Sequence, residues 1–584
     1  MIIREGLAIA LLALVSASQT VSAVAAESWR MVTTPHFRVL SQAGDRQTQL
    51  WIRNYEQFIS AVSTGVGIKA NALPPLTVIL FARDKEFTPY KLMRPDGNIA
   101  RVSGQFVRLA GISAIGMAAD SEQAETKRIV YHEATHWLMS VDPARHPTWF
   151  SEGIAEMFST FEQNGSKMNW AKPIPSHLQR LQRNGLLPLK DFLARSDALK
   201  DQERDDDRYY AQSWAFVHFL MLSPPSKMQM LDRILVESRK SSSEAAVSKV
   251  FGANLAALEN EFNHYVQQAA FSYFTFPSDV TAESPASVAA PPAIVDAALG
   301  FMALATGRKE LAQQHAQRAV ELATELPDGH EVLALLARQN KDEATARKHV
   351  EAAIRAGSRS AEMYLMMANS LGRERAGGFQ ATVAARIPLL QKAIALDPVQ
   401  RGAYRQLAND LMYYEKPKAE ELHVLEQGQS LFADDDWIKV AVATASVRLG
   451  GGNDALKAIQ TALRPDSSLT SDERRSIGSL RRSLLMQAMD AELKGAQEKN
   501  DIAAARAVVA RYRQTAGDDK EIADYLQRRD NSFEMSQLVA RMNATLGSGR
   551  TAELNQLFDQ ILAHPAVTPQ LRNFVETTRK NLKQ

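Results

Sequence analysis

The sequence predicts an α+β domain in the first half of the chain and an all-α array of helical hairpins in the second half. Three observations carry this expectation. Short β-rich segments alternate with helical stretches up to residue 117, and helical periodicity dominates beyond it. A stretch rich in Pro, Ala and Ser follows at 276–293. After it, a helix-turn-helix period of 34 residues recurs.

Length and composition bound the class of protein. The chain has 584 residues, too many for one hydrophobic core, which predicts about two to three domains. Hydrophobic residues make up 45% and charged residues 23%, as in ordinary soluble globular proteins. The net charge of +2 supports neither nucleic-acid binding nor electrostatic attachment to a membrane. We therefore expect no nucleic-acid partner.

The N-terminal segment predicts export. Arg4 precedes a short apolar run, Leu7–Val15, and small residues are frequent in Ser16–Ala26. This pattern is typical of a cleaved signal peptide at 1–26, and the apolar run is too short to span a membrane. The candidate cleavage sites follow Ala23, Ala25 and Ala26. A retained N-terminal anchor is the alternative.

The chain has no cysteine, which excludes a lipoprotein attachment site, structural disulfides and thiolate metal ligands. Together with the signal peptide, this composition predicts a periplasmic or secreted protein of the bacterial envelope.

The domain expected at 27–275 begins with a small sheet. Its β-rich segments are Trp29–Leu40, Leu76–Phe81 and 98–117, with a helix predicted at Gln47–Val66 between the first two. Helices are expected after the sheet, including a helical stretch from 175 to about 270. The elements that carry chemistry lie at the start of this helical half.

The run His132-Glu133-Ala134-Thr135-His136 predicts a zinc site. Histidines at positions i and i+4 lie on one face of a helix, so both imidazoles can bind a single Zn²⁺. Glu133 points to the same side, where it can deprotonate a metal-bound water. The alternative is an ordinary helix that happens to carry two histidines.

A third protein ligand is expected from the segment that begins at Pro147. Thr148 is a candidate N-cap, so Glu152 would lie in the first turns of a second helix, with Glu156 one turn further along the same face. Glu152 is then the carboxylate ligand, and Glu156 can accept the free N–H of a ligating imidazole. A solvated acidic stripe is the alternative.

These two segments together resemble the gluzincins, the His-His-Glu zinc peptidases that include thermolysin and the aminopeptidase N-like enzymes. The run Trp149–Phe158 is most similar to the peptidase MA-like group of bacterial envelope proteins. The resemblance implies a zincin-like α+β fold, a Zn²⁺ cofactor and hydrolysis of peptide bonds with Glu133 as general base.

The resemblance also implies a tyrosine that stabilises the oxyanion from a helix downstream of the glutamate ligand. Tyr210 matches that position better than Tyr209, with simple packing of both rings as the alternative. His218 lies in an apolar run and is expected to be a core histidine. His146, a loop histidine before proline, is either structural or a substrate contact.

One departure from the family concerns specificity. The aminopeptidases carry a Gly-x-Met-Glu-Asn motif that captures a free amino terminus, whereas 103–116 here contains no carboxylate. We expect an edge strand or hairpin beside the cleft, to which an extended peptide could add by main-chain hydrogen bonds. The difference argues against aminopeptidase specificity.

The stretch at 276–293 has the composition of a linker, so we expect the part before it to fold separately. Beyond it, Arg318-Ala-Val-Glu-Leu aligns with Ala352-Ala-Ile-Arg-Ala at a spacing of 34 residues. Lys392-Ala-Ile-Ala-Leu-Asp-Pro follows after 40 more, and Lys457-Ala-Ile after a further 65. This pattern resembles tetratricopeptide repeats.

We therefore expect a tetratricopeptide-like solenoid at 294–465, and degenerate repeats or a helical C-terminal cap at 466–584. A helical array without repeats is the alternative. Such repeats present a concave surface to a protein partner.

The favoured function is an exported zinc metallopeptidase whose repeats dock a substrate or partner. Two alternatives remain: a metal-binding scaffold of weak or no activity that acts through its repeats, and a zinc amidase that acts on cell-wall peptides. Neither the natural substrate, the choice between endo- and exopeptidase action, the oligomeric state nor the repeat partner follows from these residues.

Overall fold

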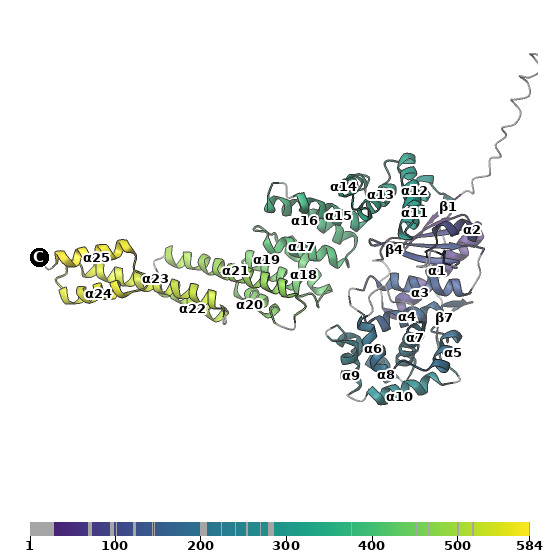
Figure 1. Ribbon diagram of the computed structural model, residues 1–584, viewed down its shortest axis with the longest axis horizontal. Helices are drawn as coiled ribbons and strands as arrows, with labels where there is room; N and C mark the ends of the chain where they lie inside the picture. The colour runs from purple at the N-terminus through teal and green to yellow at the C-terminus, as the bar shows by residue number, and fades with distance from the viewer. Residues whose placement is uncertain are drawn as a thin grey trace, which may run out of the picture. The chain divides into compact units, whose positions relative to one another are not determined.

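The structure is a computed structural model, and it divides the chain into two compact units. The first comprises the residues up to Glu374 together with Lys392–Gln400, and the second comprises Arg375–Gln391 together with Arg401–Gln584 (Figure 1). The residues described are 29–582 except 68–72, 94–97, 101, 121–123, 143, 145, 199–206, 224, 240, 253–254, 269, 278–284, 375–376, 451, 465–466, 499–500 and 517–518. The predicted signal peptide at 1–26 lies outside them.

A six-stranded mixed sheet forms the first layer of the first unit. Its order is β4 (Gly104–Leu109), β5 (Ile112–Ala118), β3 (Leu76–Phe81), β2 (Arg38–Ser41), β1 (Arg30–Thr33) and β9 (Val288–Ala289). The β2–β3 and β3–β5 pairs are parallel, and the remaining pairs are antiparallel. The three β segments expected from the sequence all contribute strands to this sheet.

Both faces of this sheet are apolar, because alternate side chains of a strand point to opposite faces. On β3, Val78 and Leu80 belong to the core that includes α1 (Asp45–Val66), whereas Ile79 and Phe81 belong to a second core. A strand buried on both faces has a nearly continuous apolar run, as β3 does in Val78–Phe81. Each face therefore requires its own covering helices.

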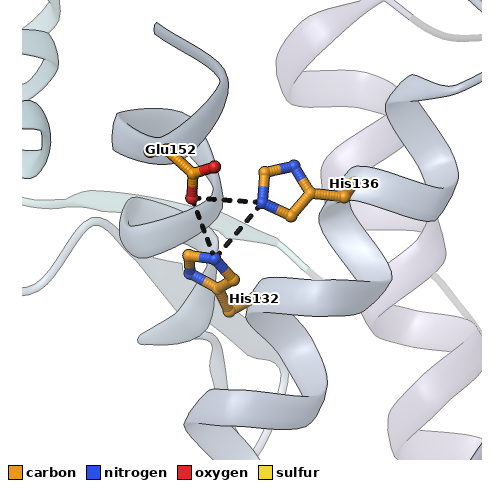
Figure 2. A group of neighbouring side chains, drawn as sticks. All are labelled: His132, His136 and Glu152. Carbon is orange, nitrogen blue, oxygen red and sulfur yellow. Dashed lines mark hydrogen bonds and ion pairs between the residues drawn. The ribbon is translucent and has the colours of Figure 1, made fainter. Parts of the chain in front are cut away.

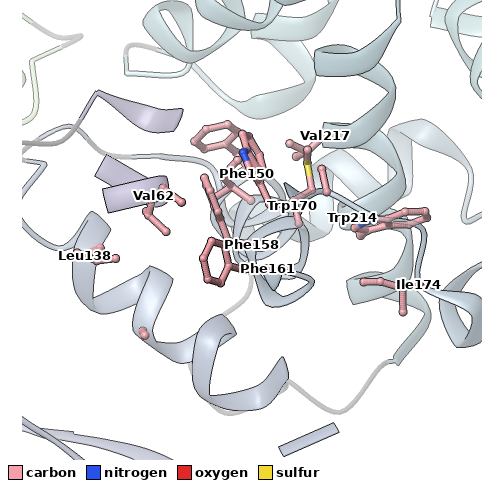
Figure 3. Packing of buried hydrophobic residues seen from close by; sticks show 14 of the residues in the cluster. Val62, Leu138, Phe150, Phe158, Phe161, Trp170, Ile174, Trp214 and Val217 are labelled. Atoms are coloured by element: carbon pink, nitrogen blue, oxygen red, sulfur yellow. The ribbon is translucent and has the colours of Figure 1, made fainter. Parts of the chain in front are cut away.

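The helical half of the first unit surrounds α4 (Thr148–Ser159), which packs between α3 (Ala124–Met139) and α7 (Asp207–Leu222). Large aromatic side chains fill the core around α4, among them Phe150, Phe158 and Trp214 (Figure 3). The other elements here are β6 (Glu162–Asn164), β7 (Lys167–Trp170), α5 (Pro175–Asn184), α6 (Leu189–Ala198), α8 (Pro225–Glu237), α9 (Ser243–Phe251), α10 (Leu255–Val266) and β8 (Phe274–Pro277). Two short helices, α2 (Asp84–Phe87) and η2 (Thr88–Tyr90), instead lie at the second face of the six-stranded sheet.

The stretch at 276–293 does not divide the chain into two separately packed parts. β8 ends in it and pairs with β7, and β9 lies in it and pairs with β1. The next helix, α11 (Pro292–Ala305), covers the second face of the sheet, where Met302 and Leu299 share a core with Phe81. The first unit therefore continues to Glu374. Composition predicted a boundary at 276–293, whereas the apolar second face of the sheet makes the following helices part of the same core.

Polar contacts tie the same helices to the sheet region. His315 Nδ1 lies 2.8 Å from Asp296 Oδ1, and its Nε2 lies 2.9 Å from the Tyr90 hydroxyl. Arg38 on β2 donates to Asp328 Oδ1 over 2.9 Å. These contacts join α11, α12 (Lys309–Leu322) and α13 (Pro327–Gln339) to β2 and η2.

Among the described residues from 292 onward, helices are the only regular secondary structure. The first unit continues with α14 (Glu343–Arg355) and α15 (Ala361–Glu374), and α16 (Phe379–Leu396) has residues in both units. The second unit contains α17 (Arg401–Tyr413), α18 (Ala419–Leu431), α19 (Asp436–Arg448), α20 (Gly452–Ala462), α21 (Ser471–Glu498), α22 (Ile502–Ala516), α23 (Lys520–Thr545), α24 (Thr551–Ala563) and α25 (Pro569–Asn581). No helix among the described residues is long and apolar enough to cross a membrane.

The aligned alanines test the repeat pattern directly. Ala319, Ala353 and Ala393 occupy the same position of the motif, and all three are buried. Ala458, the fourth, is exposed, so the motif at 457 does not pack as the others do. Further on, α21 has 28 residues and α23 has 26, which is too long for hairpins of the 34-residue period. The regular repeats therefore precede the long helices.

Candidate metal centre

Two neighbouring helices carry the predicted zinc ligands. His132 and His136 lie one turn apart on α3, and Glu152 lies in the second turn of α4. The N-cap of α4 is Pro147 and not Thr148, which is the first helical residue. This one-residue correction leaves Glu152 and Glu156 one turn apart on α4.

The three ligand atoms form a nearly equilateral triangle (Figure 2). His132 Nε2 lies 3.2 Å from His136 Nε2. Each of these atoms lies 3.3 Å from Glu152 Oε2. Three donors that surround one tetrahedral Zn²⁺ at about 2.0–2.1 Å lie about 3.3–3.4 Å from one another. The donor set therefore fits zinc in both chemistry and spacing, and it leaves the fourth position open.

Close packing of α4 on α7 fixes the position of Glu152. The next residue is Gly153, and a Cβ there would lie 2.4 Å from the Ser213 carbonyl oxygen and 2.4 Å from Val217 Cγ2. Only glycine allows the two helices to approach this closely. Because Glu152 precedes this contact, its carboxylate is held against the two histidines with 4% of the residue exposed.

Electrostatics favours an ionised carboxylate beside the histidines. Burial raises the pKa of Glu152, but hydrogen bonds and charge from His132 and His136 lower it by a larger amount, so the net pKa lies well below its usual value. Burial lowers the pKa of His132, whereas Glu156 and Glu152 raise it by more, so the net pKa lies well above its usual value. Without a metal this site attracts protons, and a bound metal has to displace them.

Glu156 faces the side of His132 that points away from the other predicted ligands. Its Oε1 atom is 3.3 Å from His132 Nδ1, the nitrogen that does not face the other ligands. Its Oε2 atom is 3.1 Å from Arg128 Nη2 and 3.2 Å from His177 Nε2. Burial raises the pKa of Glu156, but His132 and His177 lower it further, so the net pKa lies well below its usual value.

Arg128 and His177 were not identified from the sequence. Arg128 lies four residues before His132 on the same helix, so helical spacing alone could have suggested it. His177 lies on α5, and no local spacing connects it with the motif.

A cleft of about 480 Å³ opens over the cluster. Glu133 and Tyr210 both line it, together with Glu152 and His177. The ring of Tyr210 lies 6.3 Å from that of His132, measured between centroids. Tyr209 is instead buried and packs against Phe192. Of the two tyrosines, the structure therefore places Tyr210 at the cleft, because successive helical residues point about 100° apart.

His218 and His146, the other two histidines considered in the sequence analysis, lie outside the cluster. His218 is fully buried, with its ring nitrogens 2.7 Å from the Tyr265 hydroxyl and 3.1 Å from the Ala171 carbonyl oxygen. Burial lowers its pKa to about 4, as expected for a neutral core histidine. His146 lies 2.8 Å from Asp142 Oδ2 and packs against Phe150, and it is not among the described residues that line the cleft.

The segment at 103–116 forms the expected hairpin. β4 is the edge strand of the six-stranded sheet, pairs with β5 and packs beside α3. Ala110 and Gly111 form its two-residue turn with φ values of 53° and 75°, both in the left-handed region that such tight hairpins favour. The edge strand of the sheet thus lies next to the helix that carries the two histidines.

No family model and no curated relative matches the chain. Among solved structures, it is similar to YrrB, described as a TPR protein with an unusual peptide-binding site, with 17% identity and a TM-score of 0.25 over 29% of this chain and 84% of that one. It is also similar to TTC0263, a thermophilic TPR protein of Thermus thermophilus, with 19% identity and a TM-score of 0.20 over 32% and 98%. A third is pilF of Pseudomonas aeruginosa, with 14% identity and a TM-score of 0.23 over 40% and 96%.

Proposed function

We propose that this chain is an exported zinc-dependent hydrolase of peptide bonds, of the gluzincin type. The single observation that carries the proposal is the triangle of His132, His136 and Glu152, with edges of 3.2–3.3 Å, beneath a cleft that Glu133 also lines. A purely structural metal site would have no need of a carboxylate at the open position.

The residues of the cleft divide the work. His132, His136 and Glu152 would hold Zn²⁺, which supplies a Lewis acid when it is bound. Glu133 would accept a proton from the attacking water and deliver it to the leaving amine. The hydroxyl of Tyr210 would donate to the oxyanion that develops on the scissile carbonyl. The edge of β4 would hold the substrate backbone as an added strand.

The test compares wild type with Glu133→Gln on a bacterial envelope extract, each with and without a chelator, and maps new peptide termini by mass spectrometry. We expect new termini with wild type alone, and their loss on chelation. The variant should retain zinc and lose on the order of 10²–10⁴-fold in rate, because it lacks the general base. Equal cleavage by both proteins, or a wild type that retains no zinc, contradicts the proposal.

A second candidate is a metal-binding scaffold of weak or no activity that acts through its helical repeats. The observation that favours it is the all-α array from α11 onward, which holds none of the candidate catalytic residues. In that case wild type retains zinc but yields no new termini, and Glu133→Gln captures the same protein partners as wild type. Hydrolysis of amide bonds in purified cell-wall peptides by wild type, and not by Glu133→Gln, would instead identify an amidase.

A further inference from the structure

Glu156 connects three helices beneath the metal centre. It comes from α4 and is 9% exposed, and its carboxylate meets nitrogen atoms from two other helices. His132 and Arg128 come from α3, at 3.3 Å and 3.1 Å, whereas His177 comes from α5, at 3.2 Å. Through His177, α5 therefore contacts the group of side chains around Glu156. His177 is too distant in sequence from α3 and α4 for the spacing of residues along the chain to reveal this contact.

The chemistry of a carboxylate fixes the direction of these contacts. An ionised carboxylate only accepts hydrogen bonds, so each nitrogen that faces it has to carry the proton. On His132 this keeps the proton on Nδ1, so Nε2, the atom that faces His136 and Glu152, is the nitrogen that can give up its proton and bind a metal. The orientation of Glu156 therefore decides which nitrogen of His132 is free to bind a metal.

The two oxygens of Glu156 have different duties. Oε1 faces His132, whereas Oε2 faces both Arg128 and His177. Contacts at Oε2 from two different helices resist rotation of the carboxylate, so they keep Oε1 on His132. The ring of His177 also packs against Trp214, a fully buried residue of α7, with 6.2 Å between the ring centroids.

We propose that His177 is a positioning residue of the metal centre. Its Nε2, 3.2 Å from Glu156 Oε2, pairs with that oxygen. This pair holds Glu156 Oε1 on His132 Nδ1 and so directs His132 Nε2 toward a bound metal. The inference rests on the proposed zinc site and adds a residue to it that contacts neither metal nor ligand. It assigns α5 a part in metal binding that the His-Glu-x-x-His motif and its glutamate do not include.

The experiment measures zinc affinity by competition with a chromophoric chelator in the full-length protein. His177→Met removes the donor but keeps most of the volume, whereas His177→Gln keeps an N–H that can reach Glu156. His146→Met is the matched control, because His146 pairs with Asp142 and does not contact Glu156. We expect His177→Met to weaken zinc binding by about 10-fold, the lower end of the range of about 10–100-fold for direct partners of ligating histidines, because His177 acts through Glu156. His177→Gln and His146→Met should stay within about twofold of wild type.

The absorption spectrum of the cobalt-substituted protein gives a second measurement. A changed intensity of the d–d bands in His177→Met, with the wild-type spectrum in His177→Gln, reports a misdirected ligand and supports the proposal. Equal affinity and equal spectra in wild type and His177→Met overturn it. Equal weakening by both substitutions also overturns it, because the ring would then act by packing and not by donation. If wild type binds no zinc, the proposed function is wrong. This outcome is distinct from those that overturn only the role of His177.

Discussion

At the scale of single residues, neighbouring positions of one helix acquire different roles from the direction in which they point. Tyr209 and Tyr210 are adjacent in sequence, yet one packs against Phe192 in the core and the other lines the cleft above His132. The same holds on α3, where His132 joins the triangle of predicted ligands and Glu133 lines the cleft. Chemical role here follows from the helical angle between residues.

Tyr210→Phe tests the oxyanion role at this scale. We expect kcat on a peptide substrate to fall by on the order of 10²-fold with little change in KM, because an oxyanion donor acts mainly in the transition state. Steady-state kinetics measures both constants, and Tyr209→Phe is the control. If Tyr209→Phe alone lowers kcat, the assignment of Tyr210 is wrong.

At the scale of elements, the contact between α4 and α7 determines where the third ligand lies. Backbone and side-chain atoms of α7 would lie 2.4 Å from a Cβ at Gly153, a distance that side chains do not adopt. Any larger residue has to push the helices apart. Because Glu152 precedes this glycine, a shift of α4 moves the carboxylate away from the two histidines.

Gly153→Ala should therefore lower both stability and zinc affinity. Overpacking of this kind costs typically about 1–3 kcal/mol of unfolding free energy. Thermal unfolding with and without zinc measures the first effect, and chelator competition measures the second. Gly44→Ala is a suitable control, because nothing lies within 4 Å of a Cβ added at Gly44. Gly165→Ala is not suitable, because the φ of Gly165 is positive. Wild-type zinc affinity in Gly153→Ala would contradict the role of this contact.

Glu331 is a titratable residue of α13, the helix that packs against the second face of the sheet. Burial raises the pKa of Glu331 to about 7, although a hydrogen bond from the Ser358 hydroxyl, 2.6 Å long, opposes the rise. The folded state thus holds this proton more tightly than the unfolded chain. The stabilising contribution of Glu331 is full below the usual carboxyl pKa and is lost as the pH rises through about 7.

Glu331→Gln stays neutral at every pH, so its advantage over wild type should grow with pH. We expect similar Tm values for the two proteins near pH 5 and a higher Tm for the variant near pH 8, measured by differential scanning calorimetry. Glu321→Gln, an exposed change on α12, should show no such trend. A Tm difference between wild type and Glu331→Gln that is the same at both pH values would contradict the assignment.

At the scale of the whole molecule, the sheet and the first repeat helices share one core. Leu299 and Met302 on α11 cover Ile79 and Phe81 on β3. The part that holds the candidate metal centre therefore extends past the Pro, Ala and Ser stretch, up to Glu374.

Two shortened chains test this organisation. A chain ending at Pro277 exposes the second face of the sheet, so it should aggregate or unfold without cooperativity. A chain ending at Gln400 keeps every residue of the first unit and should unfold cooperatively and retain zinc. Analytical ultracentrifugation, circular dichroism and zinc analysis compare the two. A soluble, zinc-retaining chain that ends at Pro277 would show that the repeats are dispensable for folding.

The sequence by itself determined what depends on local spacing. His132 and His136 share a helical face because they are four residues apart, and Glu152 and Glu156 do so for the same reason. The strands at 30–41, 76–81 and 104–118 followed from apolar runs and alternation, and Ala319, Ala353 and Ala393 are buried at the repeated positions. These features require only the geometry of one element.

Only the tertiary structure decided which distant residues meet. His177 joins Glu156 because α5 packs beside α7, and no periodicity along the chain records that contact. The composition of 276–293 predicted a boundary, but composition does not reveal that the sheet has a second apolar face for α11 to cover. Burial of that face is a property of the assembled layers, and it makes the first repeats part of the unit that carries the candidate metal centre.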